Sequence, residues 1–229
     1  DPRAEWEAHD AKLKAHCEKL NALDLDYLHY QAPNGTDFTC WLIPGAQWHG
    51  GGDTLPDGTF FDPNMPTEEV FTSPMRGRCE GTLVSTLPLS YQGNLIDKFS
   101  ITFANGRVVS CQAEQGQALL ERMVAMDEGA AMLGELALVP VESPISQQGI
   151  LYYNTLFDEN AACHVALGRG FNEVIPGFDT MSGEELKAKG INDSIIHVDF
   201  MIGCRELSIT GVTRDGREVP IFRNGTWAL

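Results

Sequence analysis

Hydrophobic and polar residues alternate with a period of two along much of the chain. Residues 25–31 and 37–43 show this alternation on either side of Asn34-Gly35, a pair that favours a tight hairpin turn. Further segments have the same alternation, and Asn-Gly or Asp-Gly pairs separate several of them. These segments are 81–87, 95–103, 107–113, 194–202, 206–212 and 218–222. The pattern predicts a sheet that is largely antiparallel.

Three other segments have helical spacing. Pro2 suits the first turn of a helix over residues 1–23, where apolar residues recur on one face. Residues 116–126 and 159–167 also predict helices. We therefore expect an α+β fold: a mixed, largely antiparallel β-sheet or a partly closed barrel, flanked by helices near 3–22, 116–126 and 159–167.

Composition bounds the size of the core and the class of partner. The chain has 229 residues, of which 43% are hydrophobic, so it can bury a full core, and we expect one domain over residues 1–229. Its 32 Asp and Glu outnumber its 16 Lys and Arg and give a net charge of −16, the wrong sign for binding a phosphate backbone. We expect no nucleic-acid partner, and ligands that carry a positive charge or an amine.

Two further features indicate the compartment. No apolar run reaches the ~18 residues that a membrane span needs, and the first residues lack a basic and apolar secretion signal. Six cysteines are scattered without a CxxC pair, which is typical of buried thiols in a reducing environment. We expect a cytoplasmic protein without a membrane partner.

A turn in the first third of the chain carries the first candidate site residues. Pro63 and Pro66 stiffen a segment that ends in the adjacent carboxylates of Glu68 and Glu69. A rigid turn of this kind can hold a metal ion. It closes a loop over residues 44–66 that is rich in Gly, Pro and Asp and lacks the Gly-Lys-Ser or Gly-Lys-Thr of a phosphate loop.

Four residues downstream are possible partners for these carboxylates. Glu135 comes just before an apolar run, where a lone acid is costly unless it is paired or bound to a cation. His164 lies among apolar residues of a predicted helix, a setting more typical of a hydrogen-bonded core histidine than of a ligand. His197 and Asp199 are two residues apart on a predicted strand, so both project from one face and can reach one ion.

Together these residues offer oxygen and nitrogen ligands without a thiolate; they are Glu68, Glu69, Glu135, His164, His197 and Asp199. The donor set suits Zn, Co or Mn, and its size suits two adjacent ions. Two divalent ions ~3.5–4 Å apart can share a water, lower its pKa and clamp a tetrahedral intermediate. Hydrolysis of an amide is the reaction class that this set favours.

Five stretches of the chain also resemble one known family. They are Asn-Gly-Thr-Asp at 34–37, the Glu-Glu turn at 63–72, Gly-Glu-Leu-Ala-Leu-Val-Pro at 134–140, the segment from Tyr to Gly at 153–168, and His-Val-Asp-Phe-Met-Ile-Gly at 197–203. They closely resemble the aminopeptidase S / aminopeptidase T family, the thermophilic-type metallo-aminopeptidases also called PepS. The resemblance runs nearly from end to end of the chain.

This resemblance implies a cytosolic exopeptidase that removes N-terminal residues from peptides with a free N-terminus. It implies two divalent metal ions and a homodimer around an enclosed chamber. The metal ligands of the family carry over onto Glu69, Glu135, His164, His197 and Asp199, and Glu135 or Glu69 is the candidate bridging carboxylate. The family also carries an N-terminal α/β domain, so the chain is expected to be the C-terminal, metal-binding lobe of a two-domain enzyme.

One more carboxylate and one departure from the family affect the expected chemistry. Glu68 is expected to shuttle a proton from water to the leaving amine; its alternative role is that of an exposed neighbour of a ligand.

The family often has a tyrosine seven residues after the histidine of the 153–168 segment, and this chain has Phe171 there. A step that used the phenol would be lost.

The same sequence features are compatible with two other functions. A dinuclear amidase or deacylase could have the same ligand set, and it would act on substrates with blocked N-termini. A non-catalytic assembly lobe could use the five ligands to close a structural metal site.

Overall fold

The computed structural model describes all 229 residues. It begins with helix α1 (Pro2–Asn21), where the Asp1 carboxylate accepts a hydrogen bond from the backbone N–H of Arg3 and caps the first turn. The helix buries Leu13, Cys17 and Leu20 against the sheets. The predicted first helix is confirmed. None of the helices is long and apolar enough to cross a membrane.

The larger of two main sheets has nine strands, all of them paired antiparallel. Its order is β15-β14-β13-β1-β2-β6-β8-β7, and β9 pairs with β8. The strands are β1 (Leu25–Gln31), β2 (Asp37–Leu42), β6 (Pro74–Val84), β7 (Leu89–Tyr91), β8 (Asn94–Ala104), β9 (Arg107–Gln115), β13 (Ser208–Thr213), β14 (Glu218–Arg223) and β15 (Thr226–Trp227). The hairpins predicted at the Asn-Gly and Asp-Gly pairs are confirmed.

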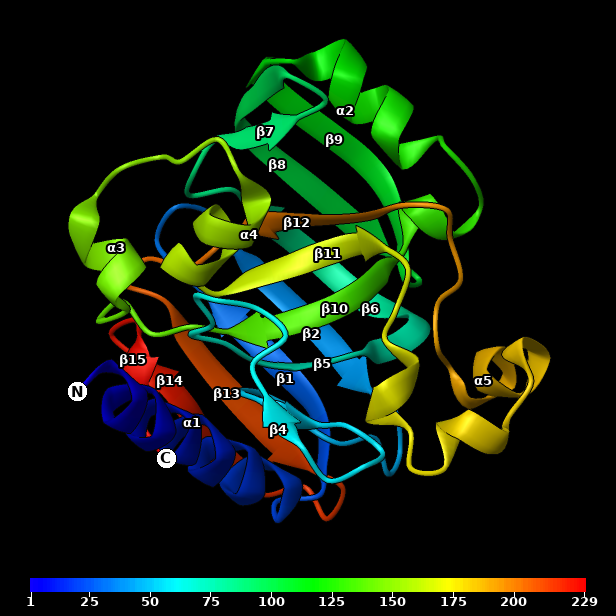
Figure 1. The fold of residues 1–229 in the computed structure, drawn as a ribbon. Helices are drawn as coiled ribbons and strands as arrows, with labels where there is room; N and C mark the ends of the chain where they lie inside the picture. The colour runs from blue at the N-terminus through cyan, green and yellow to red at the C-terminus, as the bar shows by residue number, and fades with distance from the viewer.

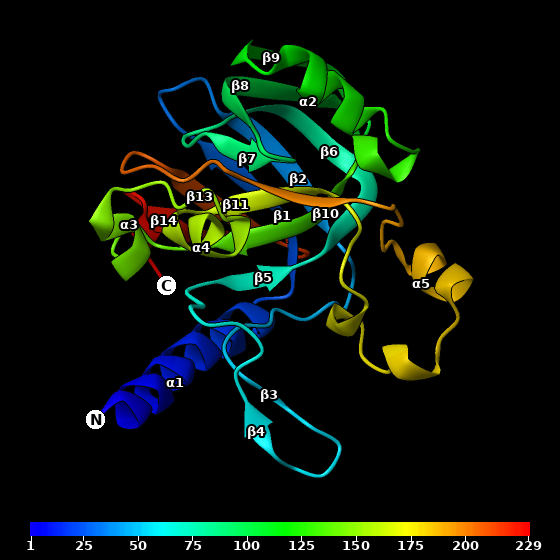
Figure 2. The same ribbon diagram turned by 45° about the horizontal axis from the view of Figure 1, so that its top comes forward.

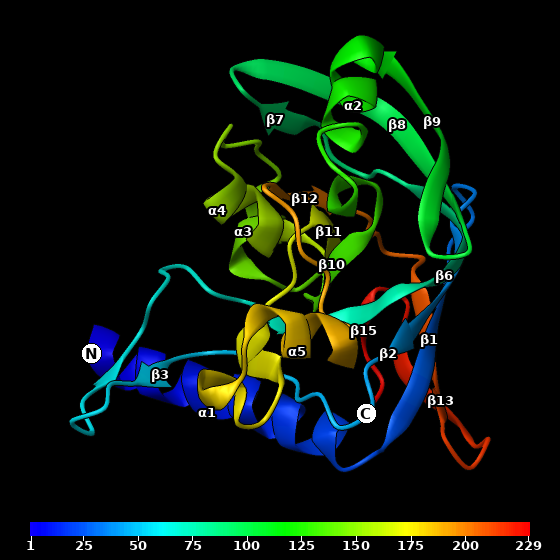
Figure 3. The ribbon, with the colours of Figure 1, turned by 90° about the vertical axis from the view of Figure 1, so that its right-hand side faces the viewer.

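A smaller, four-stranded antiparallel sheet lies in front of the larger one in Figure 1. Its order is β12-β11-β10-β5, and its strands are β5 (Val70–Thr72), β10 (Leu133–Leu138), β11 (His164–Gly168) and β12 (His197–Met201). The side view in Figure 3 shows the two sheets as separate layers. The sheets form no closed barrel, and every strand pair in them is antiparallel. The predicted α+β fold with largely antiparallel pairing is confirmed, and of the two forms expected the open sheet is the one that occurs.

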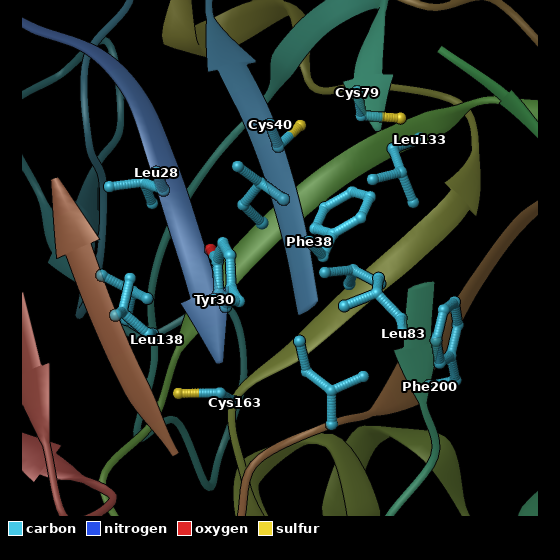
Figure 4. Packing of buried hydrophobic residues seen from close by; sticks show 14 of the residues in the cluster. Leu28, Tyr30, Phe38, Cys40, Cys79, Leu83, Leu133, Leu138, Cys163 and Phe200 are labelled. Carbon is cyan, nitrogen blue, oxygen red and sulfur yellow. The ribbon is translucent and has the colours of Figure 1, made fainter. Parts of the chain in front are cut away.

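The hydrophobic core fills the space between these two layers. Figure 4 shows Leu28, Tyr30 and Phe38 of the larger sheet in one cluster with Leu138 and Phe200 of the smaller one, and all five side chains are buried. Burying each such side chain stabilises the fold by roughly 1.5–3 kcal/mol. The core therefore fixes one face of the small sheet and leaves its other face for chemistry.

The predicted helix over residues 159–167 is wrong. Only a 3₁₀ turn, η2 (Glu159–Ala161), forms there, and the chain then enters strand β11. All five residues of β11 are buried, so the strand lacks the alternation of apolar and polar residues that would identify it. The predicted helix over 116–126 is confirmed as α2 (Gln117–Val124).

Several short elements were not predicted. The long loop before the Glu-Glu turn contains the small hairpin of β3 (Asp53–Thr54) and β4 (Phe60–Phe61), which lies with α1 beyond β5 in Figure 2. Between β11 and β12 the chain forms an arm that carries α5 (Gly183–Lys189), whose start is fixed by a capping box of Ser182 and Glu185. The remaining short helices are α3 (Pro144–Gln148), α4 (Thr155–Asp158), η1 (Gly129–Ala131), η3 (Asn172–Val174) and η4 (Phe178–Thr180).

Candidate metal centre

Four of the predicted site residues lie on the face of the small sheet that points away from the core. Glu135 comes from β10, His164 from β11, and His197 and Asp199 from β12. Their strand neighbours point into the core, because successive side chains of a strand project to opposite faces. The prediction that His197 and Asp199 share a face is confirmed, and His164 joins them from a strand rather than from a helix.

Small residues form the floor of this face. Ala166 on β11 is opposite Glu135 on one side and Asp199 on the other, and Gly168 is opposite His197. Neighbouring strands are about 4.8 Å apart, so the longer side chains of Glu135 and Asp199 can converge above the methyl group of Ala166. The floor thus leaves space where the carboxylates meet.

The ligand atoms form two overlapping groups. Glu69, Glu135 and His164 place one ligand atom each within 4.8 Å of one another, and so do Glu135, His197 and Asp199. Glu69 reaches the site from the residue just before β5. Glu135 belongs to both groups, which is the arrangement that a bridging carboxylate between two ions requires.

Both imidazoles have a defined tautomer. His164 Nδ1 lies 3.0 Å from the carbonyl oxygen of Ala162, and His197 Nδ1 lies 2.7 Å from that of Arg169. A carbonyl oxygen only accepts, so each Nδ1 carries the hydrogen and donates it. In the neutral form of each imidazole, Nε2 therefore points its lone pair into the site, as in histidine ligands that are oriented by a backbone carbonyl.

The Nε2 atoms face carboxylate oxygens at short range. His164 Nε2 is 3.0 Å from Glu69 Oε2, and His197 Nε2 is 3.1 Å from Glu135 Oε2 and 3.3 Å from Asp199 Oδ1. A neutral imidazole that carries its hydrogen on Nδ1 cannot donate from Nε2, so Glu69 Oε2 and Asp199 Oδ1 are then buried without a hydrogen-bond partner. A buried carboxylate oxygen without a partner is costly, and a cation between these atoms would remove the cost. The residues fit a divalent metal ion.

Charges in the site shift the pKa values of these groups strongly. Burial alone would lower the pKa of both histidines, but contact with Glu69 raises that of His164 to about 10, and contact with Asp199 and Glu135 raises that of His197 to about 11. Burial raises the pKa of Glu135 to about 8. Asp199 is also buried, yet its contact with His197 lowers its pKa. Without a cation, protons on the two imidazoles balance the carboxylates.

Glu68 lies apart from this cluster. Its Oε2 is 3.7 Å from His9 Nε2 on α1, and it forms no ion pair with His164 or His197. Burial raises the pKa of Glu68. Its backbone N–H donates to Asn160 Oδ1 at 2.7 Å, which ties the Glu-Glu turn to the segment before β11. The role of Glu68 as proton carrier stays a prediction.

Two further residues border the site. Glu159 is a site residue that was not predicted, and burial, followed by the charge of Asp199, raises its pKa to about 8. It lies on a 3₁₀ turn, where no periodicity marks a position, and only its distance of five residues from His164 could have drawn attention to it. Phe171, which stands where the resemblance leads us to expect a tyrosine, places its ring centroid 4.9 Å from that of His197, so this position offers an apolar ring to the site.

The fold and this donor set define a metalloprotein whose centre is built from carboxylates and imidazoles. The chain belongs to the thermophilic metalloprotease (M29) family, whose model matches residues 1–227. This confirms the resemblance that the sequence motifs indicated. Membership in a metalloprotease family implies that the protein uses a divalent metal cofactor.

Named relatives agree with this assignment. The chain is 50% identical over 229 residues to aminopeptidase 2 of Geobacillus stearothermophilus and 50% identical to aminopeptidase AmpS of Bacillus subtilis. These matches cover all of this chain and 55% and 56% of those proteins. The structure of wild-type AmpT from Thermus thermophilus matches with a TM-score of 0.94 and 41% identity, over 100% of this chain and 56% of that one. The chain thus spans about half the length of these relatives, and it matches their C-terminal part.

Proposed function

We propose that this chain is the metal-binding catalytic lobe, a single domain over residues 1–229, of an aminopeptidase that hydrolyses the N-terminal peptide bond of peptides. The observation that carries the proposal is the sharing of Glu135 between two ligand groups, beside two buried carboxylate oxygens that have no hydrogen-bond donor while the imidazoles are neutral. The family and its named relatives support the reaction class.

The five ligands divide between two divalent ions. Glu69 and His164 would hold one ion, His197 and Asp199 the other, and Glu135 would bridge them. The mixed oxygen and nitrogen donors without a thiolate suit Zn, Co or Mn. When bound, such an ion pair lowers the pKa of a shared water and polarises the scissile carbonyl.

The remaining residues position substrate and protons. Glu68, which is only 12% exposed, would take a proton from the attacking water and pass it to the leaving amine. The side chain would need to turn from His9 toward the cluster to do so. Phe171 packs on His197 and offers no hydrogen-bond donor, so it can hold the imidazole in place but cannot stabilise a developing oxyanion.

The net charge of the chain and the family resemblance suggest which substrates it attracts, where it acts and how it assembles. A net charge of −16 attracts substrates that carry a free amine. The family resemblance adds a cytoplasmic homodimer around an enclosed chamber. Light scattering at micromolar concentration should give the mass of a dimer, and a monomer with full activity on dipeptides would contradict the enclosed chamber.

The test compares peptides with free and N-acetylated termini on the full-length protein loaded with Zn, Co or Mn. An aminopeptidase loses nearly all turnover on the acetylated peptide. Equal turnover of both peptides would identify an amidase or deacylase instead. Elemental analysis of the same sample completes the test, because a non-catalytic assembly lobe would retain its metal and hydrolyse neither peptide.

A further inference from the structure

A hollow of about 710 Å³ opens beside the metal centre, at the edge where His197 lies. Its volume is within the range of ligand sites, roughly 300–1,000 Å³. The His197 side chain is 28% exposed, more than any other member of the ligand cluster. His197 is the one ligand of the cluster that also lines the hollow, so the hollow and the metal centre share this side chain. Arg76, Arg169 and Lys187 bring three positive charges into its wall.

Two of these three cations have no acidic partner. Arg76 pairs with Glu128 at 3.1 Å, but Arg169 and Lys187 have no carboxylate oxygen within 4.0 Å. Asp193 also lines the hollow and forms no ion pair with either of them. Acids outnumber cations two to one in the whole chain, whereas the hollow is lined by three of each. Once Arg76 is paired with Glu128, Arg169 and Lys187 face a wall that is less negative than the rest of the chain, and such a wall favours an anionic ligand.

The other acid of the hollow is already engaged. Asp127 accepts hydrogen bonds from the hydroxyl of Ser194 at 2.8 Å and from the backbone N–H groups of Ala130 and Ile195 at 2.7 Å each. These hydrogen bonds fix the carboxylate beside the backbone. Burial raises the pKa of Asp127, but the hydrogen bonds outweigh that effect and lower the pKa. Asp127 is therefore not a free counter-ion for Arg169 or Lys187.

Arg169 has a fixed position relative to the metal centre. Its backbone N–H donates to the carbonyl of Ile196 at 2.7 Å, and its own carbonyl accepts the Nδ1–H of His197 at 2.7 Å. The backbone of Arg169 thus moves with the metal-ligand strand. Lys187 comes from α5, at the end of the arm between β11 and β12.

We propose that Arg169 and Lys187 bind the C-terminal carboxylate of short peptides whose N-terminal residue occupies the metal centre. The inference rests on the proposed aminopeptidase function and adds a substrate class, namely tripeptides and peptides of similar length. Three residues of extended chain span about 10 Å, which is a length that a hollow of this volume accommodates. A carboxylate that reaches these cations gains charge-assisted hydrogen bonds that a C-terminal amide does not.

The experiment uses the full-length, metal-loaded protein with two substrates, leucyl-glycyl-glycine and its C-terminal amide. We expect kcat/KM for the acid to exceed that for the amide by about tenfold or more, with the difference in KM. Arg169→Gln and Lys187→Gln should each reduce this ratio, and the double variant should bring it close to one.

Matched substitutions control for the loss of a positive charge. Lys189→Gln changes an exposed lysine of the same helix, and Arg205→Gln an exposed arginine elsewhere, and neither residue lines the hollow. Both variants should keep the wild-type ratio. Near-UV circular dichroism of each variant verifies its fold.

Two results would overturn the inference: a wild-type ratio near one, or a double variant that keeps the wild-type ratio. If neither substrate is hydrolysed, it is the proposed function that fails. Calorimetric titration of both tripeptides then still tests the carboxylate site, because equal affinities for acid and amide overturn it without any need for turnover.

Discussion

Glu68 and Glu69 are adjacent in the chain, yet their carboxylates lie on opposite sides of the turn before β5. Glu69 contacts His164 in the small sheet at 3.0 Å, whereas Glu68 faces His9 of α1 at 3.7 Å. Successive residues of an extended segment project in opposite directions, so one turn offers one carboxylate to the metal centre and another to the helix.

This separation predicts different effects on mutation. Glu69→Gln removes a ligand charge, so metal content should fall and activity with it. Glu68→Gln should keep the metal and lower turnover by ~10²- to 10⁴-fold with little change in binding, because it removes only a proton carrier. Elemental analysis beside kcat and KM for each variant checks both. Loss of metal from Glu68→Gln but not from Glu69→Gln would reverse the assignment.

A second prediction concerns pH and chelation. In the chelated protein the folded-state pKa values of His164 and His197 are raised to about 10 and 11, so their contribution to stability is complete below their ordinary pKa of 6.5 and is lost as pH rises toward those values. Glu135 adds to this loss from pH 4.5 to about 8, because burial raises its pKa. The melting temperature of the chelated protein should therefore fall from pH 6.5 to 9.

Metal binding reverses this trend. Protons leave the two imidazoles when the ions bind, so affinity should increase with pH and the difference in melting temperature between loaded and chelated protein should widen. Thermal melts at several pH values, with and without chelator, measure this directly. A chelator that changes neither the melting temperature nor peptide turnover would contradict a metal centre at this position.

A third prediction tests the floor of the site without touching a ligand. Ala166→Leu would fill the space between Glu135 and Asp199, so metal content should drop below about a tenth while the chelated protein keeps its near-UV spectrum. Ala166→Ser leaves the space open and should keep the metal. Ala104→Leu at the end of β8 is a control for enlarging an alanine in a strand. Full metal content in Ala166→Leu would place the ions elsewhere.

Glu159 provides a fourth prediction. Glu159→Gln removes a negative charge beside the ligands, and metal affinity should fall by about 10- to 100-fold, the usual effect of changing groups around a metal ligand. The chelated variant should be more stable than the wild-type protein above pH 4.5, because burial of the ionised Glu159 destabilises the fold as pH rises toward 8. Glu142→Gln on the surface should change neither quantity. Unchanged metal affinity in Glu159→Gln would show that it is a bystander.

Alternation and turn residues predicted much of the fold. Strands β1 and β2 have one buried and one more exposed face, so their period of two is visible in the sequence. The same rule placed His197 and Asp199 on one face. The capped start of α1 was also predictable, because Pro2 marks its first position.

The rest of the site depends on tertiary structure. Strand β11 is buried on both faces, and its small and apolar residues are compatible with a helix as well as a strand. The convergence of Glu69 with His164 depends on the pairing of β5 with β10, which joins segments more than sixty residues apart. No local pattern contains that pairing, and family resemblance supplied what local patterns could not.

The carbonyl groups of Ala162 and Arg169, which orient the two imidazoles, belong to the main chain. Every amino acid supplies such a carbonyl, so no substitution at these two positions deletes the acceptor, and the histidine orientation is inherited with the path of the strands rather than with particular side chains. Ala162 is buried against Gly203 and has little room for another side chain, whereas the side chain of Arg169 is exposed and free to vary. Arg169 can consequently change its side chain, and with it the preference for one class of peptide, while the metal centre beside it stays the same.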